Sequence, residues 1–408
     1  MHIECTNGSP IVSTLDHLPP LPLFVSYHER SSKSTILTLP QTEKDELGIY
    51  HALRLRGRVR HIELVLRPSI LHKVVVAFMD QHFSILEHLS LSFADTVKNS
   101  LPLVLPKAFL APNLRRLILP SISPPRRLRA LSSTSSLVKL ELSTIQTSSY
   151  FRPRLLVARL SSLPKLEELS IGFTFPIPRP NTERELLGEQ RAPVTLPGLK
   201  TLQFKGVGAY LESLVAQIRV PLLEWLSITL FNQIAFVLPH LFHLINSFTT
   251  GFKLPTASVR FDGKEVSVAA HSWTTSQDVL CIRVICEPLD WQIDCGAQIC
   301  HAIILALSHV EQITIYCDHS QDIQTELQNG AIDSTAWHDL LRSFTGVQRL
   351  HIDHILVEEL SRSLQVVEVG SDPGFLPNLR YISAMRNLFA SFIDTRRVVR
   401  RPVKFIKW

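Results

Sequence analysis

Glycine is scarce in this sequence, with 15 residues in a chain of 408. The chain also has no G-x-S-x-G nucleophile elbow, no H-E-x-x-H zinc motif, no Walker loop and no G-x-G-x-x-G dinucleotide motif. Enzymes that cradle phosphate depend on glycine-rich loops, because these let backbone N–H groups approach the phosphate closely. We therefore expect a non-catalytic protein that needs no cofactor.

Cysteine is also sparse, and the chain has no C-x-x-C pair and no finger-like histidine spacing. Six cysteines are few for a disulfide scaffold of this length. Five of the six cluster between residues 281 and 317: Cys281, Cys286, Cys295, Cys300 and Cys317. Free thiols are readily buried, so we favour core thiols over a zinc site and expect no metal.

The sequence also has no long hydrophobic run typical of a transmembrane helix. Its most apolar stretches are short or carry Pro and His. The opening "MHIECTNGSPIV" has neither the basic nor the apolar segment of a signal peptide. A net charge of +6 with 19% charged residues is a mild excess that does not by itself imply nucleic acid. We expect no membrane partner and a cytoplasmic or nuclear location.

One short phrase recurs along the chain, in the form L-x-x-L-x-L. Clear copies start at Val59, Leu86, Leu114, Leu137, Leu166, Leu199 and Leu223, and weaker ones at Thr256, Val279, Val310, Val347 and Leu379. The mean period is roughly 29 residues, at the upper end for leucine-rich repeats. Apolar residues at the fourth and sixth positions predict a short strand with one buried face.

Helical patterns fill several of the intervals, such as "ILHKVVVAFMDQHF", "YLESLVAQI" and "CGAQICHAIILALSH". A strand–helix unit cannot bury its apolar face alone, so neighbouring units stack. A doubly wound α/β sheet also alternates strands and helices, but one recurring phrase without a nucleotide loop favours the solenoid. The predicted fold is an irregular α/β leucine-rich-repeat solenoid with a parallel concave sheet and a convex side of mixed helices and loops.

The repeats depart from regularity in several places. The asparagine that regular leucine-rich repeats carry after the strand is absent, and Pro precedes many strands, as in "APNL", "LPKL" and "LPGL". Asp262-Gly263 lies between two alternating runs, which is typical of a hairpin. We expect a flanking segment at 1–40, a solenoid at 41–395 with weaker repeats from about 250, and a closing segment at 396–408.

Several stretches resemble fungal F-box-like leucine-rich-repeat proteins of mushroom-forming species. They are "LDHLPPLPLFVSY", "LTLPQTEKDELGIYHALRLRGRVRHIEL", "PLDWQIDCGAQIC", "STAWHDLLRSFTGVQRLHI" and "FIDTRRVVRRPVKFIKW". In that family an F-box upstream of the repeats docks on the adaptor of an SCF-type ubiquitin ligase. The first forty residues here contain no F-box phrase. The resemblance therefore implies the substrate-recognition part of such a ligase, with the adaptor as a partner only if an F-box lies upstream.

The third and fifth positions of each phrase should point onto the concave face. This selects Arg116, Glu168, Trp225 and Arg349 as candidate partner-binding residues, with His351 and Asp353 of "HIDHI". Trp225 is the outlier, because aromatic side chains are enriched at binding hot spots. The alternatives are that a flanking loop covers it or that the strand register is shifted. His351 and Asp353 would suit a metal or an acid–base pair, but no third ligand or nucleophile accompanies them, which favours solvated surface.

Basic stretches support an alternative function, namely binding of nucleic acid or a phosphorylated partner. Its candidates are Arg116, Arg126, Arg127 and the arginines of "RRVVRRPVK" at Arg396–Lys404. Val398, Val399 and Val403 between those arginines instead suggest a half-buried closing strand or cap, which solenoids need. We favour a protein partner over nucleic acid.

Overall fold

The computed structural model describes residues 3–5, 21–29, 39–94, 103–106, 108–120, 122–123, 131, 134–146, 150–174, 192–231, 237–272, 278–318, 334–366, 376–385, 388–398 and 400–407. The chain forms two compact units. Unit 1 comprises residues 1–205 and 217–223, and unit 2 comprises residues 206–216 and 224–408. Each is an α/β unit built on a sheet whose strands are mostly parallel.

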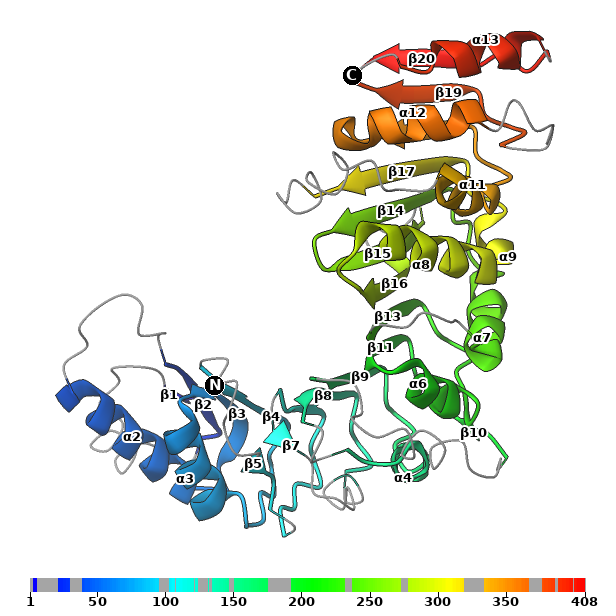
Figure 1. The fold of residues 1–408 in the computed structure, drawn as a ribbon. Coiled ribbons are helices and arrows are strands. Elements are labelled where there is room, and N and C mark those ends of the chain that lie inside the picture. Colours follow the sequence, from blue (N-terminus) through cyan, green and yellow to red (C-terminus); the bar gives the residue numbers. More distant parts are fainter. Residues whose placement is uncertain are drawn as a thin grey trace. The chain divides into compact units, whose positions relative to one another are not determined.

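The sheet of unit 1 is parallel at every described pairing. Its strands lie in the order β1 (Ile3–Cys5), β2 (Leu23–His28), β3 (Val59–Leu66), β4 (His88–Phe93), β6 (Arg116–Ile118), β8 (Lys139–Ile145), β9 (Glu168–Phe173) and β11 (Thr201–Gly206). Helices α2 (Leu39–Arg54), α3 (Pro68–Phe78) and α4 (Pro153–Leu160) lie along one face of it (Figure 1). Two small sheets pair β5 (Leu103–Val104) with β7 (Ile122–Ser123), and β10 (Val194–Thr195) with β12 (Ile218–Arg219).

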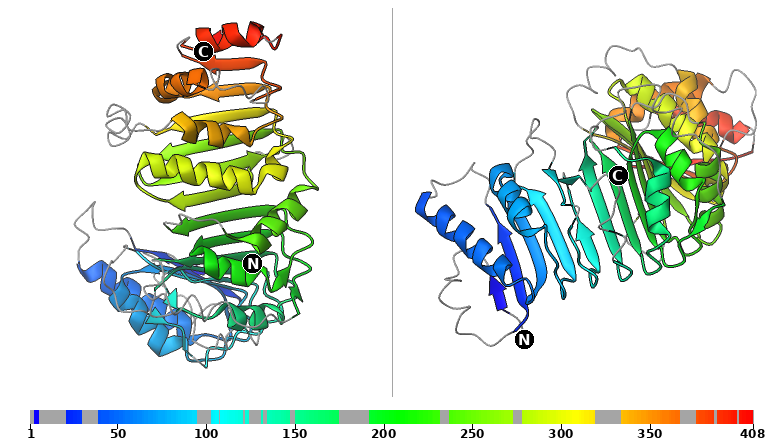
Figure 2. Two further views of the ribbon diagram at one scale, coloured as in Figure 1. Left: turned by 45° about the vertical axis from the view of Figure 1, so that its right-hand side comes forward. Right: turned by 90° about the horizontal axis from the view of Figure 1, so that it is seen from below.

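The sheet of unit 2 contains one antiparallel strand. Its order is β13 (Trp225–Phe231), β16 (Asp278–Ile285), β15 (Glu265–His271), β14 (Thr256–Asp262), β17 (Gln312–Cys317), β18 (Arg349–Ile352), β19 (Tyr381–Ala384) and β20 (Lys404–Lys407), with β15 antiparallel to both neighbours. Its helical segments are α6 (Gly208–Val215), α7 (Pro239–Thr249), α8 (Leu289–Ala302), α9 (Ile304–Leu307), α11 (Ser334–Arg342), η3 (His354–Leu356), α12 (Val357–Val366) and α13 (Ala390–Val398). In Figure 2 the helices again lie along one face of the sheet.

A β-turn precedes many of the strands and explains the recurring proline. In most copies the N–H of the first-position residue donates to the carbonyl three residues earlier, as in Leu114 to Ala111 at 3.1 Å and Leu166 to Leu163 at 3.2 Å. The same bond starts the copies at Leu137, Leu199, Leu223, Val310, Val347 and Leu379. Proline is favoured at the second position of such a turn because its φ is already fixed there. The repeat is thus longer than L-x-x-L-x-L by a buried residue three positions upstream.

Successive turns stack through the residue that precedes the first position. Asn113 donates its side-chain amide to the Ser84 carbonyl at 2.7 Å, and Asn378 donates to the Thr345 carbonyl at 2.9 Å. At the same place Gly346 allows a close approach of backbones: an added Cβ would lie 3.0 Å from the Val310 oxygen and closer still to that of Ser308. At these three places an asparagine bond or a glycine contact thus joins one turn to the next.

The core positions predicted from the phrase are confirmed. The first-, fourth- and sixth-position residues of the clear copies are all buried, as Leu166, Leu169 and Ile171 illustrate. The predicted return helices are present as α3, α6 and α8 with α9. The five clustered cysteines are free and buried, as expected, and the described residues include no group of three or more His, Cys, Asp or Glu side chains that could hold a metal ion.

The alignment of two weak copies was wrong by two residues. Thr256 pairs with Gln312, which occupies the third position of its own phrase, so the first position is Leu254 rather than Thr256. In the same way Leu280 pairs with Leu226, a fourth-position residue, so Val279 is not a first position. Because a strand alternates with period two, a slip of two residues leaves every side chain on the predicted face.

The Asp262-Gly263 hairpin is confirmed, since Asp262 pairs with Glu265 across the Gly263-Lys264 turn. The closing strand is also present, but it begins at Lys404 rather than at Arg396. The chain is instead helical through Val398, whose side chain is 82% exposed, so the expected half-buried strand was wrong at Val398, whereas Val403 is buried just before the strand. Among the described residues, no helix combines the length and apolarity needed to cross a bilayer.

Candidate functional site

Each sheet has an open face, by which we mean the face opposite its helices. In unit 1 two rows of side chains cross this face, each row linked by the strand register. The first row is Phe24, His61, His88, Arg116, Lys139, Glu168 and Thr201, and the second is Ser26, Glu63, Ser90, Ile118, Glu141, Ser170 and Gln203. Because parallel strands pair in register, each repeat contributes one residue to each row. The residues at one variable position of the repeat therefore form a continuous surface.

The first row begins with an aromatic stack. The rings of Phe24 and His61 are parallel within 10° with centroids 5.3 Å apart, and those of His61 and His88 are within 7° at 4.1 Å. Burial, the neighbouring His61 and the cations Arg116 and Lys139 lower the pKa of His88 to about 4. Burial also lowers the pKa of His61, against the opposing effect of Glu63. The stack is therefore uncharged near neutral pH.

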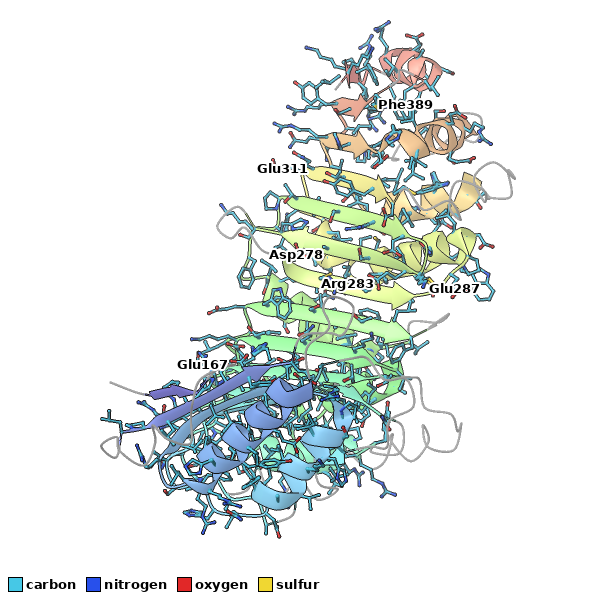
Figure 3. The ribbon with its side chains drawn as sticks, turned by 90° about the vertical axis from the view of Figure 1, so that its left-hand side faces the viewer. Glu167, Asp278, Arg283, Glu287, Glu311 and Phe389 are labelled. Carbon is cyan, nitrogen blue, oxygen red and sulfur yellow. The ribbon has the colours of Figure 1, made fainter. Side chains whose placement is uncertain are left out.

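Charges on the rest of the unit 1 face are largely paired. Lys139 Nζ lies 2.8 Å from a carboxylate oxygen of Glu168. At the strand starts Arg60 pairs with Glu87 at 3.0 Å, and Lys200 pairs with Glu167, which Figure 3 labels, at 3.1 Å. Exposed pairs of this kind contribute little stability. The face thus has aromatic rings at its β2–β4 end and mostly polar or charged side chains on the later strands.

The open face of unit 2 has cationic and aromatic groups on its later strands. Arg349, Tyr381 and Lys404 occupy one register row, and His351, Ser383 and Ile406 occupy the next. Arg349 and Lys404 are exposed. Burial lowers the pKa of His351, opposed by the charge of Asp353.

The structure does not gather the six predicted partner-binding residues into one cluster. In unit 1, Arg116 is exposed and shares its row with Glu168, with Lys139 between them. In unit 2, Arg349 and His351 lie on the open face of β18. Trp225 is half-buried at the start of β13, and the four intervening strands place β18 about 24 Å away at the usual strand spacing.

The expected surface pair of His351 and Asp353 is corrected by the structure. Strand β18 ends at Ile352, and Asp353 instead caps η3 by accepting a hydrogen bond from the Ile355 N–H at 3.2 Å. Its carboxylate also lies 2.9 Å from His354 Nδ1. Asp353 is thus engaged in local structure at the end of the strand. The candidates Arg126 and Arg127 lie outside the described residues.

Two fifth-position residues that should face outward are buried. Ser227 is buried beside Arg283, whose guanidinium lies 3.4 Å from its hydroxyl. Thr314 is buried between Ser258 on one neighbouring strand and His351 on the other. Small side chains in a sheet are covered by the longer side chains around them. The alternation of residues along one strand does not predict this covering.

A constellation that the sequence did not indicate lies on the open face of unit 2. His271 Nε2 is 3.2 Å from the Ser258 hydroxyl, and His271 Nδ1 is 2.7 Å from a carboxylate oxygen of Asp278. The three residues come from three adjacent strands, β14, β15 and β16. No short motif carries them, so only the hairpin signal at Asp262-Gly263, which brings β14 beside β15, hinted at their proximity.

A buried carboxylate in unit 2 has a structural task. Glu212 of α6 accepts hydrogen bonds from the backbone N–H groups of His240 and Leu241 at 2.7 and 3.0 Å, and lies 2.6 Å from His240 Nδ1. These N–H groups belong to the first turn of α7, where no helical carbonyl is present to accept them. The negative charge also suits the positive end of the helix. Glu212 thus joins α6 to α7, and its carboxylate is engaged in capping α7.

Comparisons with known proteins neither support nor contradict a family. No protein-family model matches the chain, and no curated protein is significantly similar to it.

Proposed function

We propose that the chain is a protein-recognition module, an irregular leucine-rich-repeat solenoid similar to the substrate-binding part of an F-box protein of an SCF-type ubiquitin ligase. Its principal task is non-catalytic, and its partner binds the open faces of the sheets. This proposal rests on the observation that different positions of the repeat have different roles. The turn and core positions recur from strand to strand, while the open-face positions change from histidine to arginine, glutamate, tryptophan and tyrosine.

The solenoid part of the proposal rests on the stacked turns. A bond or close contact between one turn and the next recurs in both units, at Asn113 and Asn378. Each repeat contacts its neighbours, which is the defining property of solenoids. In the part of the chain that the structure describes, the helices lie along one face of each sheet, which supports a solenoid over a doubly wound sheet covered on both faces.

Several of the described cations give little support to the alternative, a nucleic-acid or phosphorylated partner. Arg396 is buried and donates to the Leu376 carbonyl at 2.9 Å, and Arg397 pairs with Asp394 at 3.2 Å. Lys139, next to Arg116, pairs with Glu168. A phosphate-binding surface needs unpaired cations that converge, because its affinity comes from neutralising several phosphates together.

Affinity purification of the tagged chain from its source cells, followed by quantitative partner identification, tests the proposal. The face variant combines Arg349→Ala with Tyr381→Ala, and the control is Leu305→Ala, an exposed position on α9. We expect a partner that the wild type and the control recover equally and the face variant loses at least tenfold. Equal recovery by all three forms would refute binding at this face. Loss of the partner on nuclease treatment, together with steep salt dependence, would favour the alternative.

The ligase assignment needs a separate experiment, because it depends on a segment upstream of the repeats. The chain is purified with and without its genomic upstream region. Recovery of an SCF adaptor only with the extended form would support the assignment. Absence of the adaptor from both forms would remove it without affecting partner binding at the sheet face.

A further inference from the structure

We propose that Ser258, His271 and Asp278 form a catalytic triad in which Ser258 is an activated nucleophile for small activated carboxylic esters. This inference goes beyond partner recognition and differs from the non-catalytic expectation. It begins from the order of contacts, hydroxyl to Nε2 at 3.2 Å and Nδ1 to carboxylate at 2.7 Å. A nucleophile, a base and a group that orients the base in this sequence define the triad by geometry, whichever fold carries them.

The carboxylate decides which imidazole nitrogen carries the proton. Asp278 accepts a hydrogen bond and cannot donate one as a carboxylate, so His271 Nδ1 is protonated in the neutral ring. Nε2 is then left with a lone pair that faces the Ser258 hydroxyl. The same contact holds the ring in place and would stabilise the imidazolium that forms when Nε2 takes the proton.

A break in the strand register produces this alignment. From Glu265 to Ala270 the residues of β15 pair regularly with β16, and Ala270 lies opposite Leu280. The register then shifts, so that His271 lies opposite Asp278 instead of Val279. Bulges of this kind re-aim side chains and are frequent beside active sites. Without the shift, His271 would face a valine and the triad would lack its acid.

The neighbours of Ser258 keep the site open. The residue directly across on β15 is Ala269, whose methyl group leaves the diagonal between His271 and Ser258 free. The side chains of His271 and Asp278 are 32% and 37% exposed, so an ester can reach them. Figure 3 labels Asp278 and, further along β16, Arg283. The site is thus on the sheet surface, which suits a small acyl group.

The reaction balances without a cofactor. Ser258 Oγ bonds to the ester carbonyl carbon while its proton moves to His271 Nε2. The tetrahedral centre then collapses, the bond to the leaving oxygen breaks, and that oxygen takes the proton from Nε2. A water oxygen then bonds to the acyl carbon of the acyl-serine while one of its protons moves to His271 Nε2. The acyl–Oγ bond breaks, Oγ takes the proton from Nε2, and the carboxylic acid leaves.

The backbone around Ser258 limits the substrate class. Strand β14 is paired on both sides, with β15 and β17, so its N–H and C=O groups are committed to the sheet. The developing oxyanion would have to use side chains on the same face, Thr314 directly across and Arg260 two residues along. An oxyanion hole of backbone N–H groups supplies much of the rate of efficient hydrolases. We therefore expect reaction with activated aryl esters.

A fluorophosphonate probe and p-nitrophenyl acetate, each applied to the full chain, test the triad. We expect the probe to label Ser258, as located by peptide mass spectrometry of the wild type. Ser258→Ala should abolish this labelling, and His271→Gln should slow it by about 10²–10⁴-fold, the usual contribution of a general base. Asp278→Asn should slow it at least tenfold. Acetyl-enzyme on Ser258 should appear with the ester and disappear in the same variants.

Ser267→Ala is the matched control, because Ser267 lies on the open face of β15, opposite Arg260 and Arg283. Its labelling rate should equal that of the wild type. Labelling of Ser258 no faster than that of Ser267, or at the same rate in His271→Gln, would overturn the triad. The mapping uses the wild-type chain, so it decides the matter even if Ser258→Ala fails to fold. Neither outcome bears on partner binding, which is measured separately.

Discussion

Adding one methyl group at Gly346 tests the stacking of turns more sharply than any deletion. Gly346 precedes the strand that starts at Val347, and its backbone lies against the turn of the preceding repeat. A Cβ there would lie 3.0 Å from the Val310 oxygen and closer to the Ser308 oxygen. Both neighbours are backbone oxygens of one turn, which is closed by a hydrogen bond from the Val310 N–H to the Leu307 carbonyl at 3.1 Å. Neither oxygen can therefore move aside at low energetic cost.

The size of the effect follows from two opposing contributions. Overpacking that forces the backbone to shift typically costs 1–3 kcal/mol. Replacing glycine by alanine also restricts the unfolded chain, which stabilises by about 0.4–1 kcal/mol. We therefore expect Gly346→Ala to lower the free energy of local unfolding by about 1.5 kcal/mol, or roughly tenfold in the opening equilibrium.

Two other glycines provide a graded series. At Gly198 a Cβ would lie 3.3 Å from the Leu166 oxygen, which demands only a small adjustment, and at Gly57 it would meet nothing within 4 Å. Gly198→Ala should therefore lower the free energy of local unfolding by only about 0.5 kcal/mol. Gly57→Ala should be neutral or slightly stabilising, by up to about 1 kcal/mol.

Hydrogen exchange with mass spectrometry is the appropriate assay, because a chain with two compact units need not unfold in one step. The informative amides in Gly346→Ala are those of Gln348 and Arg349, which donate to the Glu311 carbonyl at 2.7 and 3.0 Å. Their exchange should accelerate about tenfold. Unchanged exchange there, or equal effects at Gly346 and Gly57, would refute the stacking of turns.

Three further predictions concern single contacts. Asn378→Ala removes the bond to the Thr345 carbonyl and should lower the free energy of local opening, measured by hydrogen exchange, by about 1 kcal/mol; no change would contradict a stabilising role for this bond. Glu212→Ala leaves the first N–H groups of α7 unpaired and should cost about 1–3 kcal/mol, whereas Glu212→Gln should cost less; the reverse order would contradict the cap. Because the pKa of His88 falls to about 4 on folding, from an ordinary value near 6.5, its contribution is complete above pH 6.5 and is lost as pH falls toward 4. His88→Phe should reduce the stability lost between pH 6.5 and pH 4 by about 1 kcal/mol, a value lowered because the side chain is partly exposed. An unchanged dependence of stability on pH in denaturation experiments would contradict this.

The sequence predicted the repeating core well because hydrophobic alternation is a strong signal. Leu169 and Ile171 are buried as the phrase required, and so are their equivalents along the chain. The phrase could not fix register where its first leucine was weak: a two-residue slip, as at Thr256, preserves the alternation and so goes unnoticed. The buried residue three positions upstream, such as Leu163, was visible in "LPKL" but needed the turn to give it meaning.

The functional surface was less predictable. Open-face positions such as Arg349 follow from strand alternation, but their exposure depends on neighbours on other strands, which is why Ser227 proved buried. Asp353 left the predicted face because the strand ended one residue earlier. The His271–Asp278 contact depends on a register shift between β15 and β16, and no local sequence pattern specifies such a shift.

The most direct test of partner binding at the open face is site-specific photo-crosslinking in the source cells. A photoreactive phenylalanine analogue is placed at Arg349, on the open face of unit 2, or at Leu305, which is exposed on α9. Recognition at the open face predicts a discrete protein adduct from position 349 that position 305 does not give. An adduct from position 305 alone, or from neither position while the partner still co-purifies, would contradict it.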